Sequence, residues 1–225
     1  MRMLMEFAKG DTIRHLGLLD LQRTMQRALR RSGLPVAYSN GYNPHILMSF
    51  ASALSSGIPG DAELVDVALG EERTEEECLQ AMRRALPPVM QPGRVRLVDD
   101  RFPKLGKLLT HAGYRYAVTG PDSEALLESL ASFLAKEEIM AVRKSKSAET
   151  LVNIRPMIRK LEGAKAENGV TLDAAVSFTE AATLKPDLLF VSLLREAGLQ
   201  ETGCRIRRTG LYTERDGHLI PLIEA

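Results

Sequence analysis

The fold is first indicated by residues 3–35, which read MLMEFAKGDTIRHLGLLDLQRTMQRALRRSGLP. The apolar run at residues 3–8 ends in a Lys-Gly-Asp turn and predicts a strand. From residue 17 to residue 31 the spacing becomes helical, and five apolar side chains fall within one arc of about 100°: Leu18, Leu21, Met25, Ala28 and Leu29. Gly33 and Pro35 end this predicted helix. The chain therefore opens with a strand followed by an amphipathic helix.

Outward from this stretch, strand and helix patterns continue to follow one another. Apolar residues 36–38 and 46–50 flank a polar turn, and residues 63–69 alternate as a strand does. Thr74 and Glu77 have the spacing of a capping box, which opens a helix to about residue 86. Residues 94–98 alternate again. The first half thus has the predicted order β-α-β-β-α-β.

The second half has a similar order, with one more strand between its two helices. Its predicted elements are a strand at 114–119, a helix from a cap at Asp122 to about residue 136, strands at 139–143, 150–154 and 170–178, a helix from Pro186 to Ala197, and a strand at 204–208. Two such units predict an α+β protein with two tandem ferredoxin-like (βαββαβ) domains and antiparallel sheets. We expect these domains at residues 1–102 and 113–225, joined by a linker at residues 103–112.

The composition is that of a globular protein. The 225 residues are 44% hydrophobic and 26% charged, which excludes a disordered tail protein. The sequence has no long apolar run and no leader pattern, so we expect a cytoplasmic protein without a membrane segment. The two cysteines, Cys78 and Cys204, are far apart, which excludes a zinc ribbon, a disulfide framework and a self-sufficient iron–sulfur cluster. The four histidines are dispersed and predict no metal site.

The formal net charge is +1, but the charges are segregated along the chain. The helix at 17–31 places Arg23, Arg27, Arg30 and Arg31 opposite its apolar arc, with no Glu between them. Such a face suits successive phosphate groups, and the alternative is an ordinary solvated helix face. In the second half we also expect phosphate or nucleic-acid binding by Arg155, Arg207 and Arg208. The acidic stretch at 61–77 is interpreted as an exposed helix N-terminus without chemistry.

A second candidate site is the turn at residues 38–45. Glycine, asparagine and proline explain the turn itself. They do not explain the polar and aromatic side chains beside it, so we consider a binding site at Tyr38, Ser39, Tyr42, Asn43 and His45. The alternative is a rigid turn with a purely structural role.

Catalytic motifs are missing from the sequence. It contains no phosphate-binding loop, no dinucleotide fingerprint, no HExxH and no GxSxG. We therefore predict no catalytic residue, with His45 as the candidate if the protein is an enzyme after all. Whether it is an enzyme stays open, and we expect that on its own it is not one.

Several spaced identities point to a known family. They comprise Asp20-Leu21, Arg23, residues 27–31, Gly33-Leu34-Pro35, Tyr38-Ser39, residues 41–45, Ser49-Phe50-Ala51, and the later segments 62–67, 153–156, 184–186 and 208–212. In these residues the chain resembles the radical SAM-linked proteins of the DUF2344 family. It departs from the pattern of that family at Leu18, which replaces a histidine, at Asn153, which replaces an aspartate, and at Ile46, which replaces a proline.

The resemblance implies a partner rather than a reaction, because members of this family are encoded beside, or fused behind, a radical SAM protein. It implies that a 4Fe-4S cluster and S-adenosylmethionine would belong to that partner, with no cofactor in this chain.

Three functions follow from these observations. The leading hypothesis is a non-catalytic accessory module that binds RNA or another phosphate-rich substrate for a radical SAM partner. The second is a metal-independent, ribonuclease-like RNA-processing enzyme, by analogy of fold alone. The third is a protein–protein adaptor subunit whose arginine face meets acidic residues of its partner.

Overall fold

The computed structural model describes residues 1–120, 123–144, 149–200 and 202–225. Within these ranges the chain forms five α-helices and eleven strands, and most strand pairs are antiparallel. The α+β class predicted from the sequence is therefore correct. The chain divides into two compact units: unit 1 comprises residues 1–109 and 208–225, and unit 2 comprises residues 110–207.

Unit 1 begins with a strand, a helix, two strands, a helix and a strand, and a short helix and two further strands complete it. Its elements are β1 (Arg2–Lys9), α1 (Leu18–Ser32), β2 (Met48–Phe50), β3 (Gly60–Ala68), α2 (Glu75–Ala85), β4 (Pro92–Val98), α3 (Leu105–Leu108), the second part of β10 (Gly203–Arg215), and β11 (His218–Pro221). The strands β4, β1 and β3 lie side by side and are antiparallel, and β2 also pairs with β3. At Gly60, β3 meets Arg208 of β10 in parallel register.

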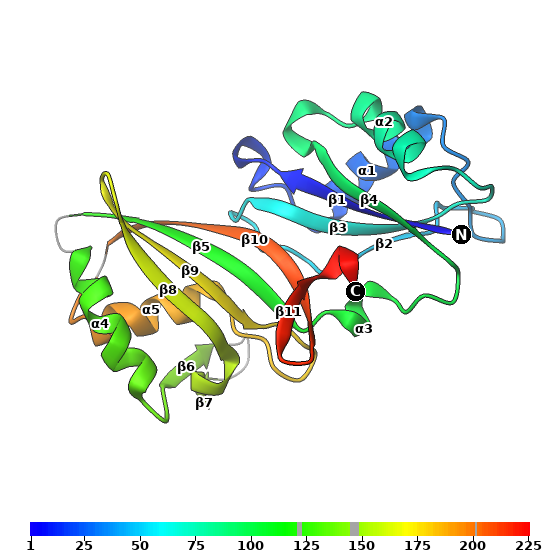
Figure 1. Cartoon of the computed structure of the whole chain (residues 1–225). Coiled ribbons are helices and arrows are strands. Elements are labelled where there is room, and N and C mark those ends of the chain that lie inside the picture. The colour runs from blue at the N-terminus through cyan, green and yellow to red at the C-terminus, as the bar shows by residue number, and fades with distance from the viewer. Residues whose placement is uncertain (121–122, 145–148, 201) are drawn as a thin grey trace. The chain divides into compact units, whose positions relative to one another are not determined.

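Both long helices of unit 1 cover the same face of this sheet (Figure 1). The face carries the odd-numbered side chains of β1 and β3, because successive residues of a strand point to opposite sides. One core joins the sheet and helices: Met3, Met5, Phe7, Leu21, Met25, Ala28, Leu29, Val65, Val67, Cys78, Ala81, Met82 and Ala85. The predicted capping box forms at the start of α2, where the Glu77 amide donates to the Thr74 hydroxyl and the Thr74 amide donates to the Glu77 carboxylate.

Unit 2 contains β5 (His111–Thr119), α4 (Glu124–Ala135), β6 (Met140–Lys144), β7 (Glu149–Asn153), β8 (Ile158–Ala166), β9 (Gly169–Ser177), α5 (Pro186–Glu196) and the first part of β10. Its strand order is β10-β5-β9-β8. The helix α4 packs against α5 and β8. Pro186 occupies the first turn of α5, as predicted. The predicted cap at Asp122 lies outside the described residues.

The prediction for the middle of unit 2 needs a correction. The predicted strands at 139–143 and 150–154 correspond to β6 and β7, but these pair with each other in a separate two-stranded sheet. The strands on the two sides of β9 are β5 and β8, and β8 was not predicted from the sequence. A Cβ atom at Gly163 in β8 would lie 2.4 Å from Leu127 of α4, so this glycine allows the helix to approach the strand closely.

The end of the chain differs from the expected domain division. The sequence placed residues 113–225 together, whereas residues 208–225 pack with unit 1. Arg94 of β4 forms an ion pair with Glu224, and Arg96 donates to the backbone oxygen atoms of Ile223 and Ala225. The last residues are thus tied to an edge strand of the first sheet.

Candidate nucleic-acid interface

The helix α1 presents four arginines on its outer side, here called the arginine face: Arg23, Arg27, Arg30 and Arg31. The opposite side buries Leu21, Met25, Ala28 and Leu29, as the helical spacing predicted. Gly33 ends the helix with a φ of 75°, a left-handed conformation that glycine adopts without strain. All four arginines are exposed.

The four arginines differ in their contacts. Arg23 donates to Asp20 at 3.2 Å in an exposed ion pair, which holds the side chain only weakly. Arg31 donates to the backbone oxygen of Ala85 at 2.9 Å and so joins α1 to the end of α2. Among the residues that the structure describes, Arg27 and Arg30 have no ion-pair or hydrogen-bond partner. Their guanidinium groups, one helical turn apart, are free to bind an anion.

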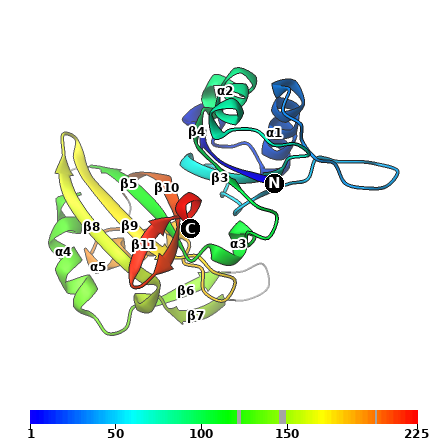
Figure 2. The same ribbon diagram turned by 45° about the vertical axis from the view of Figure 1, so that its right-hand side comes forward.

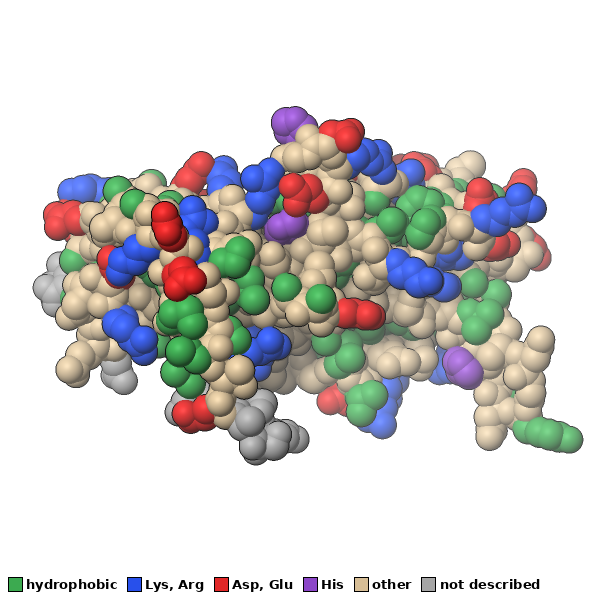
Figure 3. Space-filling model, turned by 90° about the horizontal axis from the view of Figure 1, so that it is seen from below, with side chains coloured by type: hydrophobic (Ala, Val, Ile, Leu, Met, Phe, Trp, Pro, Cys, Tyr) green, Lys and Arg blue, Asp and Glu red, His purple; other side chains and the backbone are tan. Residues whose placement is uncertain are grey.

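Other parts of the surface are electrostatically mixed. On the face seen in Figure 3, basic and acidic side chains are interspersed. Unit 2 also contains exposed ion pairs, such as Arg115 with Asp173 and Lys165 with Glu124. The arginine face differs because it carries four positive charges. Among the described residues, Asp20 is the one carboxylate that forms an ion pair with it, through Arg23.

The turn at residues 38–45 is the tip of a two-stranded arm. Ser39 donates its amide to the oxygen of His45 at 2.9 Å, and Tyr38 pairs with Ile46. The Ser39 hydroxyl lies 2.8 Å from Nδ1 of His45 and also accepts from the His45 amide. Tyr42 at the tip is fully exposed. Figure 2 shows the segment between α1 and β2 as a loop that extends away from the rest of unit 1.

These contacts give the turn residues different positions. The Ser39 hydroxyl holds the imidazole of His45 through Nδ1, which leaves Nε2 without a hydrogen-bond partner among the described residues. Asn43 is exposed in the turn, and Tyr38 is about half exposed, with 45% of its surface accessible. The structure thus brings together Ser39 and His45 from the predicted turn site, and leaves the tyrosine rings accessible to a partner.

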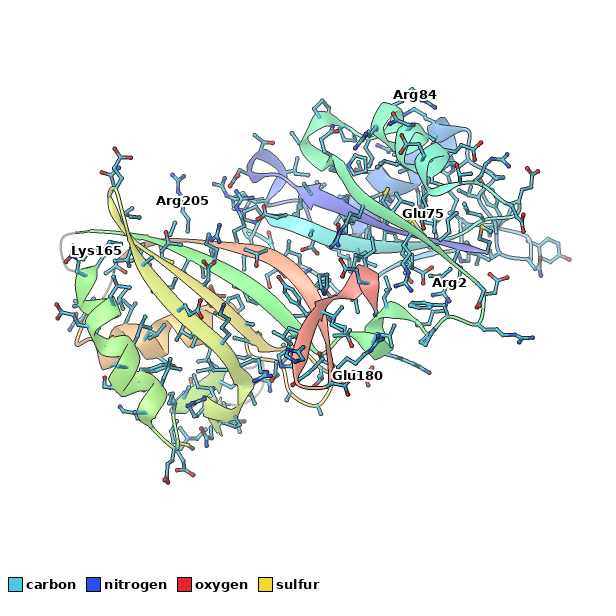
Figure 4. All side chains as sticks on the ribbon, viewed as in Figure 1. Arg2, Glu75, Arg84, Lys165, Glu180 and Arg205 are labelled. Carbon is cyan, nitrogen blue, oxygen red and sulfur yellow. The ribbon has the colours of Figure 1, made fainter. Side chains whose placement is uncertain are left out.

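The three basic residues predicted in the second half do not form one surface. Arg208 is only 1% exposed and binds both carboxylate oxygens of Glu63 through Nε and Nη2, so it is unavailable to an external phosphate, contrary to the prediction. Arg155 donates from Nε to the oxygen of Leu134 and thereby satisfies the last turn of α4. Arg207 is half-buried. Arg205, two residues before it, points away from the ribbon (Figure 4).

Unit 1 contains buried charges that were not predicted from the sequence. Glu63 was assigned to an exposed acidic stretch, but it is 3% exposed and pairs with Arg208, with a distance of 2.7 Å between Nε and Oε1. Asp66 of the same stretch is buried against Arg2, whose Nε donates to it at 3.0 Å. Arg2 also donates to the backbone oxygens of Phe102 and of Pro103, the first residue of the predicted linker, which ties this segment to β1. These charges are paired inside the fold and do not form a surface for ligands.

Lys9 is the third charged residue beside Glu63 and Arg208. Its side chain is 1% exposed, and burial lowers the pKa of its ammonium group below the ordinary value of 10.5. The nearby Glu63 carboxylate acts in the opposite direction, while Arg208 adds to the lowering. The folded protein therefore binds the Lys9 proton less tightly than the unfolded chain does.

This pKa shift predicts a pH dependence of stability. Because the unfolded chain holds the Lys9 proton more tightly, the contribution of Lys9 to stability increases as the pH rises from the lowered pKa towards 10.5. We therefore expect the unfolding free energy of the wild type to increase relative to that of Lys9→Met as the pH rises from neutral to alkaline values. Urea unfolding at several pH values measures it. A difference independent of pH would show that the pKa of Lys9 is the same in both states.

The cysteines and the other potential metal ligands suggest no reactive centre. Cys78 is fully buried, and burial raises the pKa of the Cys204 thiol to about 12. Within the described ranges, no three His, Cys, Asp or Glu residues gather closely enough to hold a metal ion. None of the described helices is both long and apolar enough to cross a membrane.

Comparison with known proteins identifies a family and a structural relative. The family model described as "Uncharacterized protein conserved in bacteria (DUF2344)" matches residues 2–186. No curated protein sequence matches the chain. A solved chain from the crystal structure of a Cbf5-Nop10-Gar1 complex superimposes with a TM-score of 0.52 at 12% sequence identity. The match covers 95% of this chain and 50% of that one, so this chain spans half the length of its structural relative.

Proposed function

This chain belongs to the DUF2344 family, and we propose that it is a non-catalytic module that binds RNA through the arginine face of α1 and acts with a radical SAM partner. The observation that carries the proposal is the pair Arg27 and Arg30, which are exposed and have no carboxylate partner among the described residues. RNA presents phosphates in series, and exposed guanidinium groups along one helix face suit such a series.

The arm at residues 37–47 supports RNA rather than an isolated phosphate as the substrate. The exposed tyrosines Tyr38 and Tyr42 offer rings on which unpaired bases stack, a contact that is common in the recognition of single-stranded RNA. Phosphate contacts on α1 and base contacts on the arm require a ligand that carries both groups. A single-stranded or looped RNA has both.

The strand orders of the two units suggest a more specific fold class than α+β. We assign both units to the ferredoxin-like class. In unit 1 the order β4-β1-β3, with β2 also paired to β3, and the position of both helices on one face support this assignment. In unit 2 the order β10-β5-β9-β8 supports it, with β6 and β7 as an insertion. The structural similarity to the chain from the Cbf5-Nop10-Gar1 complex concerns the fold alone.

The RNA proposal is tested by the salt dependence of binding. We expect the wild-type protein to bind short single-stranded RNA with a slope of log K against log salt of about −2, since three free or weakly held arginines contribute about −0.7 each. Fluorescence anisotropy over a series of salt concentrations measures this slope. A flat slope, or no binding at low salt, would remove RNA as the substrate.

The same RNA also distinguishes a binding module from a ribonuclease. We expect end-labelled RNA to remain intact after incubation with the wild-type protein, and His45→Ala to behave identically. The Nδ1 atom of His45 is occupied by Ser39, and the described residues place no carboxylate in contact with the ring. Cleavage that His45→Ala abolishes would instead assign the general acid or base to this histidine.

The partner is tested separately. The proposed radical SAM protein should be captured by the tagged chain from a lysate of cells that contain both proteins. Capture that survives nuclease treatment indicates direct protein contact, and capture lost on nuclease treatment indicates a complex held through RNA. No capture in either case would contradict this part of the proposal.

A further inference from the structure

A hollow of about 280 Å³ opens in unit 1 beside the first turns of α1. The residues lining it are Leu18, Gln22, Met48, Ser49, Phe50, Ser52 and Ala53. The sequence analysis placed Leu18 on the buried arc of α1, but 42% of its surface is exposed because it borders this hollow. The same helix therefore carries the arginine face on one side and a wall of the hollow on another.

The walls of the hollow are mainly apolar and well supported. Phe50 lies with its ring 5.7 Å from the ring of Phe7, a buried residue of β1. The amide of Ala51 donates to Leu64 at 2.9 Å, and the oxygen of Ala53 accepts from the buried Arg208. These contacts fix residues 50–53 from behind, so the lining is formed before any ligand arrives.

Three polar side chains in the lining lack hydrogen-bond partners among the described residues. The hydroxyl oxygen of Ser52 is buried and makes no hydrogen bond. Neither the amide of Gln22 nor the hydroxyl of Ser49 has a hydrogen-bond partner in the part of the chain that the structure describes. A buried hydroxyl without a partner is unfavourable, and a ligand that supplies the hydrogen bond removes this cost.

The chemistry of the hollow defines its ligand. It contains no charged side chain in its lining, which argues against a phosphate or a metal ion as the occupant. Its volume lies just below the usual range for drug-sized ligands, and therefore suits a single flat ring system rather than a peptide segment. Apolar walls with an amide and two hydroxyls match a ring that has apolar faces and a hydrogen-bonding edge.

We propose that this hollow holds one unstacked nucleobase. The inference rests on the proposed RNA binding: Arg23 of the arginine face directly follows Gln22 of the hollow on α1, so a phosphate backbone bound by the arginines would pass near the hollow. An amide group both donates and accepts, as the edge of a base does, so Gln22 reads the base edge while Phe50, Met48 and Leu18 contact its faces.

The test compares Gln22→Leu and Ser52→Ala with the control Leu19→Ala. Leu19 is 68% exposed on the same turn and does not line the hollow. We expect Gln22→Leu to weaken binding of single-stranded RNA by about tenfold, Ser52→Ala to weaken it less, and Leu19→Ala to leave it unchanged. Binding of fully paired RNA should be unaffected by all three, since it offers no free base. Thermal unfolding confirms that each variant is folded.

Two further measurements separate this inference from the RNA proposal. RNA that contains 2-aminopurine should become brighter on binding to the wild type, because the base leaves its stack, and should not do so with Gln22→Leu. If RNA binds with the expected salt slope but neither variant nor fluorescence responds, the nucleobase site is wrong and the RNA proposal stands. If RNA does not bind, titration with free nucleosides by NMR decides: shifts lost in Gln22→Leu assign the hollow to the base of a free nucleoside, and no shifts overturn the site.

Discussion

Glu63→Gln is expected to lower the free energy of unfolding by about 3–5 kcal/mol. Glu63 is the carboxylate beside two buried cations, Lys9 and Arg208, each of which is only 1% exposed. Its replacement leaves both positive charges in a region of low dielectric constant without their counter-charge. Charges stranded in this way cost far more than exposed ion pairs contribute. Urea unfolding followed by circular dichroism measures the loss.

The exposed pair Lys165 and Glu124 provides the control for this experiment. Their side chains are 70% and 57% exposed, and we expect Glu124→Gln to change the unfolding free energy by less than about 1 kcal/mol. Equal losses in Glu63→Gln and Glu124→Gln would contradict the buried electrostatic cluster. A double variant, Glu63→Leu with Arg208→Met, should recover part of the loss because it removes a buried cation together with the carboxylate.

The triple variant Arg23→Glu, Arg27→Glu and Arg30→Glu is expected to weaken RNA binding by about 100-fold or more at low salt. If the three guanidinium groups contact phosphates, their reversal also makes the salt slope shallower by about two. Arg31 is left in place because it bonds to the backbone of Ala85 and contributes to folding. The three replaced side chains lie opposite the buried side of α1, so their individual effects on stability should stay within about 0.5 kcal/mol.

A control variant with the same change in net charge tests whether the loss of binding is specific to the arginine face. Arg84→Glu, Lys104→Glu and Lys107→Glu together make the same change in net charge within unit 1 and lie outside α1. All three side chains are exposed, and Figure 4 shows Arg84 on α2. We expect this variant to retain most of the affinity and the salt slope. Equal losses in both variants would indicate a general charge effect, and unfolding of the arginine variant would mean that the face is structural.

Local patterns were enough to predict most helices and several strands. The boundaries of α1 and α2 follow from helical spacing, a glycine after the last turn and a capping box, all of which act over a few residues. The exposure of the arginine face follows from the same spacing. By contrast, β8 was missed because much of its length is exposed and polar, as is common at the edge of a sheet, and because Gly163 interrupts it.

Charged residues were the main source of wrong predictions. Glu63 and Asp66 appeared as members of an exposed acidic stretch, and Arg208 as a member of a basic strand. In the structure, each of these residues is buried with a charge of opposite sign. The type of a charged residue determines only the free energy that its burial would cost. Whether a partner offsets that cost depends on which strands become neighbours.

The sequence by itself determined the secondary structure around α1, the side of that helix that faces solvent, and the α+β class, because each depends on interactions between residues close in the chain. The tertiary structure alone decided that Arg208 meets Glu63, 145 positions away, and that residues 208–225 return to unit 1. It also placed Leu18 and Gln22 beside residues 48–53 to form the hollow. These contacts join segments distant in the chain, and no local periodicity records which distant segments pair.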